Sequence, residues 1–191
     1  MKIVRIINAP KPVLYAAKYT EHEFNELYRN IDLWIDAEYL RGFFKKYEED
    51  LKNYYTYHGV TYTINEAVKK TISDIEQLEE TLIRTAEKGV SDQEKLLETF
   101  FRPLHNREHE YYALQKSKAT STHQSWLRLY AIRIDKHLYV ITGGAIKLTQ
   151  TMNEREHTDL ELKKMDQVIG YLRNKGLINE EEFEKLELEG K

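Results

Sequence analysis

The chain has no cysteine, and it is poor in glycine and proline, which supply 8 and 3 of its 191 residues. The absence of cysteine excludes disulfides, thiolate zinc sites, iron–sulfur clusters and cysteine nucleophiles. The small share of glycine and proline excludes collagen-like and low-complexity sequences. Hydrophobic residues make up 41% of the chain, as in ordinary globular proteins, so the sequence predicts a folded chain with a sizeable core.

Long hydrophobic runs are also missing. No run approaches the roughly 18–20 residues that a membrane-spanning helix needs. The hydrophobic stretch Ile3–Ile7 is shorter than the core of a signal peptide, which is about 7–15 residues long. We therefore expect a soluble, cytoplasmic protein that has no membrane partner.

The net charge of −3 conceals an uneven distribution of charge. Residues 102–155 contain nine Lys and Arg against four Asp and Glu, a balance of +5, together with four of the seven His. The flanking segments 1–101 and 156–191 each have a balance of −4. Because contacts with phosphate are local, this pattern permits nucleic-acid binding and confines it to residues 102–155.

Hydrophobic periodicity predicts an N-terminal half that is mainly helical. Thr63-Ile-Asn-Glu66 has the form of a capping box, and Ser91-Asp-Gln-Glu94 repeats that form. Pro103 is expected to stop the helix that follows the second box. The expected elements are a strand at 13–19, helices at 22–31 and 36–54 with a break near Asp32, a loop at 54–59, a helix from 63 to about 89, and a helix after 91.

After Pro103 the pattern becomes that of a β-sheet. The run 126–134 is hydrophobic on both faces apart from its arginines, so it predicts a central strand. The other expected elements are strands at 111–115, 137–142 and 145–149, a turn at 135–136, a bend at 143–144, and helices at 160–172 and 179–188. The sequence therefore predicts a single α+β domain over residues 1–191, in which an antiparallel β-meander packs against N-terminal helices.

At the meander the sequence resembles the RelE/HigB-like toxins of bacterial type II toxin–antitoxin systems, members of the RelE/ParE superfamily. In that family a Pro-Leu turn precedes a basic strand, an Arg-aliphatic-aromatic strand lies at the sheet centre, and a further strand ends in a basic residue. The matching segments here are Leu14–Tyr19, Phe101-Arg-Pro-Leu104, Trp126-Leu-Arg-Leu-Tyr-Ala-Ile-Arg133 and Tyr139-Val-Ile-Thr-Gly-Gly-Ala-Ile-Lys147.

The resemblance covers residues 12–54 and 97–172 and implies a RelE-like core. Residues 60–96 are then a helical insertion, and residues 173–191 are an acidic C-terminal helix. It also implies a ribosome-dependent mRNA endoribonuclease that needs no metal or other cofactor. The implied partners are mRNA on the ribosome and a cognate antitoxin protein.

RNA cleavage without a metal needs a base for the 2′-hydroxyl, cations for the charged transition state and an acid for the leaving oxygen. In the resemblance, Arg128 is the central arginine that would grip the scissile phosphate in a bidentate manner. The family's terminal tyrosine has no clear counterpart, so the sequence leaves open whether nuclease activity is retained. The candidate catalytic residues are Lys116, Lys118, His123, Arg128 and Lys147.

Other interpretations remain open from the sequence. Arg128 could instead pair with a carboxylate of the inserted helices, and Lys147 could protect an edge strand. A non-catalytic protein-binding module on the same fold is the main alternative function. A metal-dependent hydrolase using His105 and His109 is a third hypothesis, although Pro103 favours a polar loop there. The aromatic residues that could line a partner surface are Trp34, Tyr39, Phe43, Phe44, Tyr47, Tyr54, Tyr55 and Tyr57.

Overall fold

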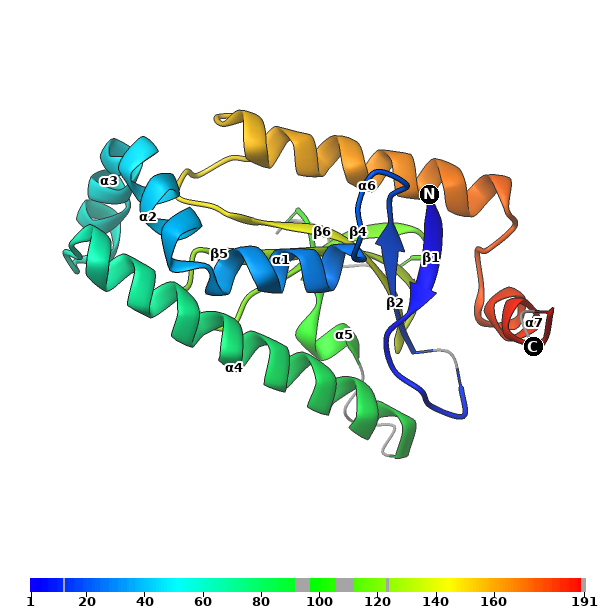
Figure 1. The fold of residues 1–191 in the computed structure, drawn as a ribbon. Coiled ribbons are helices and arrows are strands. Elements are labelled where there is room, and N and C mark those ends of the chain that lie inside the picture. Colours follow the sequence, from blue (N-terminus) through cyan, green and yellow to red (C-terminus); the bar gives the residue numbers. More distant parts are fainter. Residues whose placement is uncertain (12, 92–96, 106–111, 123, 190–191) are drawn as a thin grey trace.

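The chain folds into an α+β structure with a six-stranded mixed sheet (Figure 1). The computed structural model describes residues 1–11, 13–91, 97–105, 112–122 and 124–189. The strands in these residues are β1 (Lys2–Arg5), β2 (Leu14–Lys18), β3 (Arg102–Pro103), β4 (Gln115–Ala119), β5 (Leu127–Asp135) and β6 (Leu138–Ile146). The helices are α1 (Glu26–Ile35), α2 (Ala37–Lys46), α3 (Glu48–His58), α4 (Ile64–Ser91), α5 (Leu97–Phe100), α6 (Glu156–Asn174) and α7 (Glu180–Glu189).

The strand order is β1-β2-β6-β5-β4-β3. The predicted central strand is confirmed, because β5 pairs with β6 on one side and with β4 on the other. The prediction of a purely antiparallel meander holds for β4, β5 and β6 but is wrong for the whole sheet. β2 pairs with β6 in parallel, and the chain between them crosses over through the helices, as a parallel pair requires.

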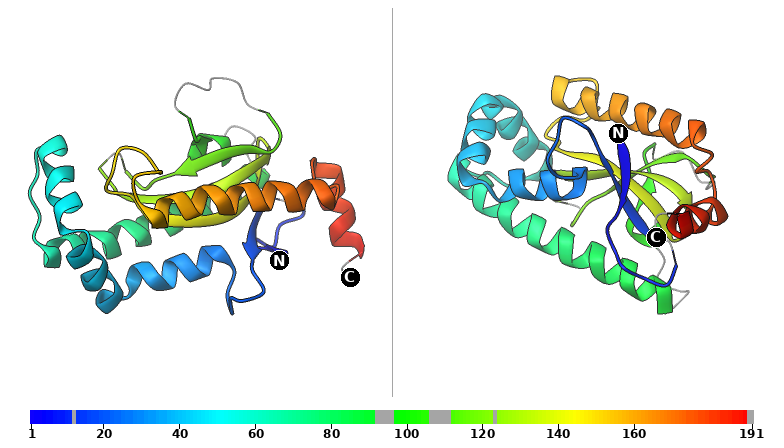
Figure 2. Two further views of the ribbon diagram at one scale, coloured as in Figure 1. Left: turned by 90° about the horizontal axis from the view of Figure 1, so that it is seen from above. Right: turned by 45° about the vertical axis from the view of Figure 1, so that its right-hand side comes forward.

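Helices cover both faces of the sheet (Figure 2). On one face, α1, α2 and α4 pack against side chains such as Leu129, Ala131 and Ile141. On the other face, α6 packs Met165 and Val168 against the sheet, and α7 adds Phe183, whose ring meets Tyr15. None of the helices in the described parts of the chain is long and apolar enough to cross a bilayer.

The helix boundaries follow local capping chemistry. The capping box at Thr63 and Glu66 is confirmed, since the Thr63 N–H donates to Glu66 Oε2 (2.7 Å) and the Glu66 N–H donates to Thr63 Oγ1 (3.3 Å). The helix break expected near Asp32 lies instead at Asp36, whose carboxylate accepts from the Glu38 and Tyr39 amides. The prediction of a loop at 54–59 is wrong, because α3 continues to His58.

Two further boundary predictions differ from the structure. The helix expected to end near Gly89 continues to Ser91, since one glycine costs a helix only about 1 kcal/mol. The prediction of a strand at 111–115 is wrong for residues 112–114, which precede β4 (Gln115–Ala119); residue 111 lies outside the described residues. Half-buried lysines alternate with the buried residues of β4, so no hydrophobic run marks the strand in the sequence. Residues 92–94 of the second capping box lie outside the described residues.

The prediction of a bend at Gly143-Gly144 is also wrong, because β6 continues through both residues, with a register shift against β5 between Ile141 and Gly143. These glycines allow helices to approach the strand closely from two sides. A Cβ on Gly144 would lie 2.6 Å from Cη2 of Trp34 in α1, and a Cβ on Gly143 would collide with Glu161 and Lys164 of α6. The glycine pair therefore fixes how α1 and α6 sit against β6.

Candidate functional site

Four of the predicted cationic residues lie on the face of the sheet that α6 packs against, and three of them come together there. Lys118 in β4 is opposite Tyr130 of β5, and Arg128 in β5 is opposite Ala145 of β6. Residues directly opposite each other in neighbouring strands point to the same face, and so do residues two apart along one strand. Lys147, two residues after Ala145, therefore joins Lys118 and Arg128. We call these three residues the basic cluster.

The charges of the basic cluster act on one another. Burial lowers the pKa of Lys147 to about 8, and the positive charges of Arg128 and Lys118 act in the same direction. Burial also lowers the pKa of Lys118, again with help from Arg128. The negative charge of Glu154 partly opposes the lowering of the Lys147 pKa. Three half-buried cations so close together favour the binding of an anion.

Neutral oxygens position the basic cluster. Within the described residues, Arg128 accordingly does not form the pair with a carboxylate of the inserted helices that the sequence left open; it contacts the hydroxyls of Thr120 and Tyr54 and two backbone carbonyls. The contacts are Arg128 Nη1 to Thr120 Oγ1 (3.1 Å), Ser125 O (2.5 Å) and Leu127 O (2.8 Å), Lys118 Nζ to Leu104 O (2.7 Å), and Lys147 Nζ to Thr149 O and Gln150 O (2.5 Å each).

The two remaining candidates are not part of the basic cluster as the structure describes it. Lys116 lies on the same face of β4, but its Nζ is 2.7 Å from the Asp166 carboxylate on α6. The Asp166 carboxylate therefore compensates the charge of Lys116, which is not available to a ligand. His123 lies outside the described residues.

Tyr54 is a neighbour of Arg128 that the sequence did not indicate. Its hydroxyl donates to the Gln124 carbonyl (3.4 Å), and its ring meets Trp126 at 5.7 Å between centroids. Burial raises the pKa of Tyr54, and the charge of Arg128 acts against this, so the hydroxyl stays protonated beside the guanidinium. The sequence does contain a signal for the position of Tyr54, because Tyr47, Leu51 and Tyr54 have the spacing of one face of a helix.

A metal centre receives no support from the described residues. His105 is exposed, and His109 lies outside those residues. Elsewhere in the described chain, no group of three or more His, Asp and Glu side chains could hold a metal ion.

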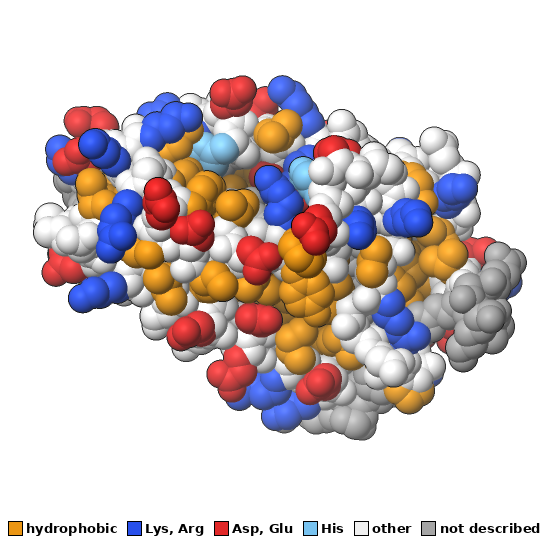
Figure 3. All heavy atoms as spheres, viewed as in Figure 1, with side chains coloured by type: hydrophobic (Ala, Val, Ile, Leu, Met, Phe, Trp, Pro, Cys, Tyr) orange, Lys and Arg blue, Asp and Glu red, His pale blue; other side chains and the backbone are white. Residues whose placement is uncertain are grey.

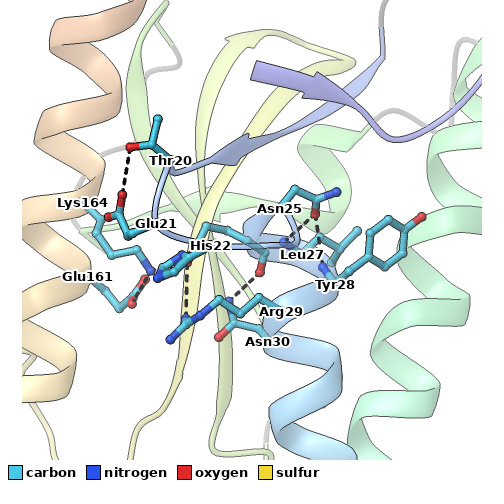
Figure 4. A network of polar contacts seen from close by, with 11 residues as sticks. Thr20, Glu21, His22, Asn25, Leu27, Tyr28, Arg29, Asn30, Glu161 and Lys164 are labelled. Carbon is cyan, nitrogen blue, oxygen red and sulfur yellow. Dashed lines mark hydrogen bonds and ion pairs between the residues drawn. The ribbon is translucent and has the colours of Figure 1, made fainter. Parts of the chain in front are cut away.

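A second polar cluster is buried between α1 and α6, next to Gly143 (Figure 4). Glu26 of α1 is fully buried and pairs with Lys164 of α6. Lys164 also pairs with Glu161 (2.8 Å), and His22 Nδ1 lies 2.8 Å from Glu26 Oε1. We call Glu26, Glu161, Lys164 and His22 the buried ionic network. It connects two helices that lie far apart in the sequence.

Glu161 is the unusual member of this network. Burial raises its pKa to about 7, although Lys164 acts in the opposite direction. Its Oε2 has no hydrogen-bond partner among the described residues. Burial, and then the negative charge of neighbouring carboxylates, also raises the pKa of Tyr19; burial raises the pKa of Tyr130 too, against the positive charge of Arg128. The site therefore favours a neutral Glu161.

We expect Glu161→Gln to change how stability depends on pH. The carboxyl pKa is about 7 in the folded chain and near its ordinary value of 4.5 in the unfolded chain. The unfolded state thus loses its proton first as pH rises, and the folded state loses stability up to about pH 7. Glutamine does not titrate, so the Tm of the variant relative to wild type should rise between pH 5 and pH 8. Thermal denaturation across that range measures it.

The same substitution at exposed Glu156, on the same helix, is the control. It should leave the pH profile of the Tm parallel to that of the wild type. Parallel profiles for Glu161→Gln would contradict the raised pKa.

In comparisons with protein-family models, curated proteins and solved structures, no match to this chain was found. The basic cluster and the arrangement of the sheet are therefore the basis for inferring a function.

Proposed function

We propose that this protein is a RelE/HigB-like toxin, a metal-independent and ribosome-dependent mRNA endoribonuclease of a type II toxin–antitoxin system. The observation that carries the proposal is the basic cluster, in which Lys118, Arg128 and Lys147 come from three consecutive strands to one face of the sheet. These are the positions at which the resemblance to that family expects cationic residues.

The arrangement of the sheet supports the same proposal. The strand that carries Arg128 lies in the middle of the sheet, and Lys147 directly follows β6. Pro103 and Leu104 precede the basic strand β4, as the family pattern requires. The first matched strand, β2, lies beside the last one, β6, so the segments that carry the resemblance form one continuous sheet.

The basic cluster has the groups that RNA cleavage requires. Arg128, anchored through Nη1, offers a planar guanidinium to the scissile phosphate, and Lys118 adds a second cation for the charge that grows in the transition state. Lys147, with a pKa of about 8, is partly neutral near pH 7.5 and can take the proton of the 2′-hydroxyl. The 2′-oxygen then attacks phosphorus and the bond to the 5′-oxygen breaks. Tyr54, protonated and beside Arg128, donates the proton that the leaving oxygen needs.

Expression in a bacterial host tests the proposal. We expect the wild-type protein to arrest growth and to cleave mRNA, and Arg128→Ala to lower the cleavage rate by about 10²-fold or more, because it removes a donor to the transition-state charge. Growth curves and mapping of mRNA 5′ ends measure both effects. Arg41→Ala, at an exposed arginine of α2, is the matched control and should behave as wild type.

Normal growth during high-level soluble expression of the wild-type protein would refute the toxin proposal. Intact mRNA together with a stable protein partner would instead select the alternative, a non-catalytic protein-binding module on the same fold.

The role of Lys147 as the base predicts a specific pH profile. With purified ribosomes programmed with mRNA, kcat/KM should rise about tenfold per pH unit below pH 8 and level off above it, because only the neutral amine accepts a proton. Lys147→Arg keeps the positive charge but does not titrate in this range, so it should be slow and nearly independent of pH. Lys136→Arg, in an exposed turn, should leave the profile unchanged. An unchanged profile in Lys147→Arg would exclude Lys147 as the base.

A further inference from the structure

Large hydrophobic side chains are exposed along α1 and the start of α2. The exposed fractions are 50% for Phe24, 42% for Tyr28, 48% for Ile35 and 38% for Tyr39. Tyr28 and Ile35 are seven residues apart and so lie on one face of α1. Phe24 precedes the N-cap of α1, and Tyr39 is in the first turn of α2. We call these four residues the α1 stripe.

Tyr28 and Ile35 lie about 90° around α1 from its core-facing side chains, on an exposed flank of the helix. Leu27, Ile31 and Trp34 of the same helix are buried against the sheet. A surface helix normally carries polar residues on its solvent-facing sides. This flank of α1 therefore has the composition of a contact surface.

Most charged side chains of the segment that carries the α1 stripe are acidic. Between residues 20 and 40 the only Lys or Arg is Arg29, which lies 3.8 Å from the buried Glu26. Figure 3 shows hydrophobic side chains over α1 and α4 bordered mainly by Asp and Glu. The exposed carboxylates of this segment are Glu21, Glu23, Asp32, Asp36 and Glu38.

We propose that the α1 stripe docks a basic amphipathic helix of another protein. The hydrophobic residues would receive a hydrophobic face presented at i, i+3, i+4 and i+7, and the acidic border would pair with Lys and Arg beside that face. The same border repels nucleic-acid phosphates, and two copies of it would repel each other, so neither RNA nor a second copy of this chain fits.

This docking surface is independent of the proposed nuclease activity. The core-facing side of α1 packs on the face of the sheet that carries Leu129 and Ile141, whereas the basic cluster lies on the face that carries Tyr130. A helix bound at the α1 stripe would leave Lys118, Arg128 and Lys147 accessible. Loss of docking and loss of RNA cleavage can therefore be measured separately.

The test uses two synthetic amphipathic peptides of about 18 residues, long enough to form a helix on binding. Both have leucine on the hydrophobic face, and the polar face carries lysine in one and glutamate in the other. We expect fluorescence anisotropy to show binding of the lysine peptide alone. The double substitution Tyr28→Ser and Ile35→Ser should weaken binding about tenfold or more. Asp32→Lys with Glu38→Lys should reverse the preference to the glutamate peptide.

Each change is at an exposed position, and circular dichroism checks that the variants fold. The proposal is overturned if the lysine peptide fails to bind at about 1 mM. It is also overturned if both peptides bind wild type equally, or if binding survives the serine substitutions. A concentration-dependent dimer in sedimentation that the serine variant abolishes would assign the α1 stripe to a second copy instead.

Discussion

Lys164→Ala is expected to lower the free energy of unfolding by about 3–5 kcal/mol, because it leaves a buried carboxylate without its cation. Glu26 is fully buried, and Lys164 is its ion-pair partner from α6. His22 and Arg29 also lie near Glu26, at 2.8 and 3.8 Å, and they offset part of the loss. We therefore expect the lower half of that range. Urea denaturation at pH 7.5, analysed for both midpoint and slope, measures the change.

The neighbouring lysine provides the matched control. Lys163 is 67% exposed and pairs with the partly exposed Asp159, so Lys163→Ala should change stability by no more than about 0.5 kcal/mol. Replacing both partners, by Glu26→Leu with Lys164→Met, should recover much of the loss, since a well-packed hydrophobic pair can replace a buried ion pair. Equal effects of the two lysine substitutions would show that Lys164 does not compensate Glu26.

Signals that act within a few residues made part of the fold predictable. The Thr63 capping box, the hydrophobic run of β5 and the stripe of α6 are all local patterns, and each formed the expected element. Period-two alternation also brought Lys118, Arg128 and Lys147 to one face once the strands were paired. The core of the candidate site was predictable for this reason.

Features that depend on distant segments could not be read from the sequence. Glu26 and Lys164 are 138 residues apart, and Glu26 on its own resembles an ordinary acidic residue in the first turn of a helix. Gly143 and Gly144 resembled a bend because their partners, on α1 and α6, are distant in the chain. Lys116 matched the predicted site pattern as well as Lys118 did. Only the position of α6 shows that the Lys116 ammonium pairs with Asp166.

The contact between the α4 segment and the sheet depends on Trp126. This residue is fully buried one position before β5, and its Nε1 donates to Thr71 Oγ1 of α4 (2.9 Å). Its ring also meets Phe44 of α2 and Tyr54 of α3, at 5.5 and 5.7 Å between centroids. The segment expected to be an insertion is therefore packed against the strand that carries Arg128.

Trp126→Ala is accordingly expected to lower the free energy of unfolding by about 3–5 kcal/mol, the usual cost of removing a large buried ring. Trp126→Phe keeps an aromatic ring but loses the donor to Thr71, so it should cost about 1–2 kcal/mol. Guanidinium denaturation of the two variants measures the difference. Similar small losses in both would mean that the ring does not hold α4 to the sheet.

Trp126→Ala should also disturb the basic cluster, through the backbone at Ser125. The Ser125 carbonyl, next to Trp126, accepts a hydrogen bond from Arg128 Nη1 at 2.5 Å. Without the Trp126 ring the backbone at Ser125 is no longer held in place, and the Arg128 guanidinium loses its position. Under conditions in which Trp126→Ala is still folded, we expect mRNA cleavage to fall along with stability. Trp34→Phe, in a fully buried ring that contacts β6 at Gly144, is the control, since it should reduce stability with less effect on cleavage. If both variants lose cleavage only in proportion to the unfolded fraction, the backbone at Ser125 does not position Arg128.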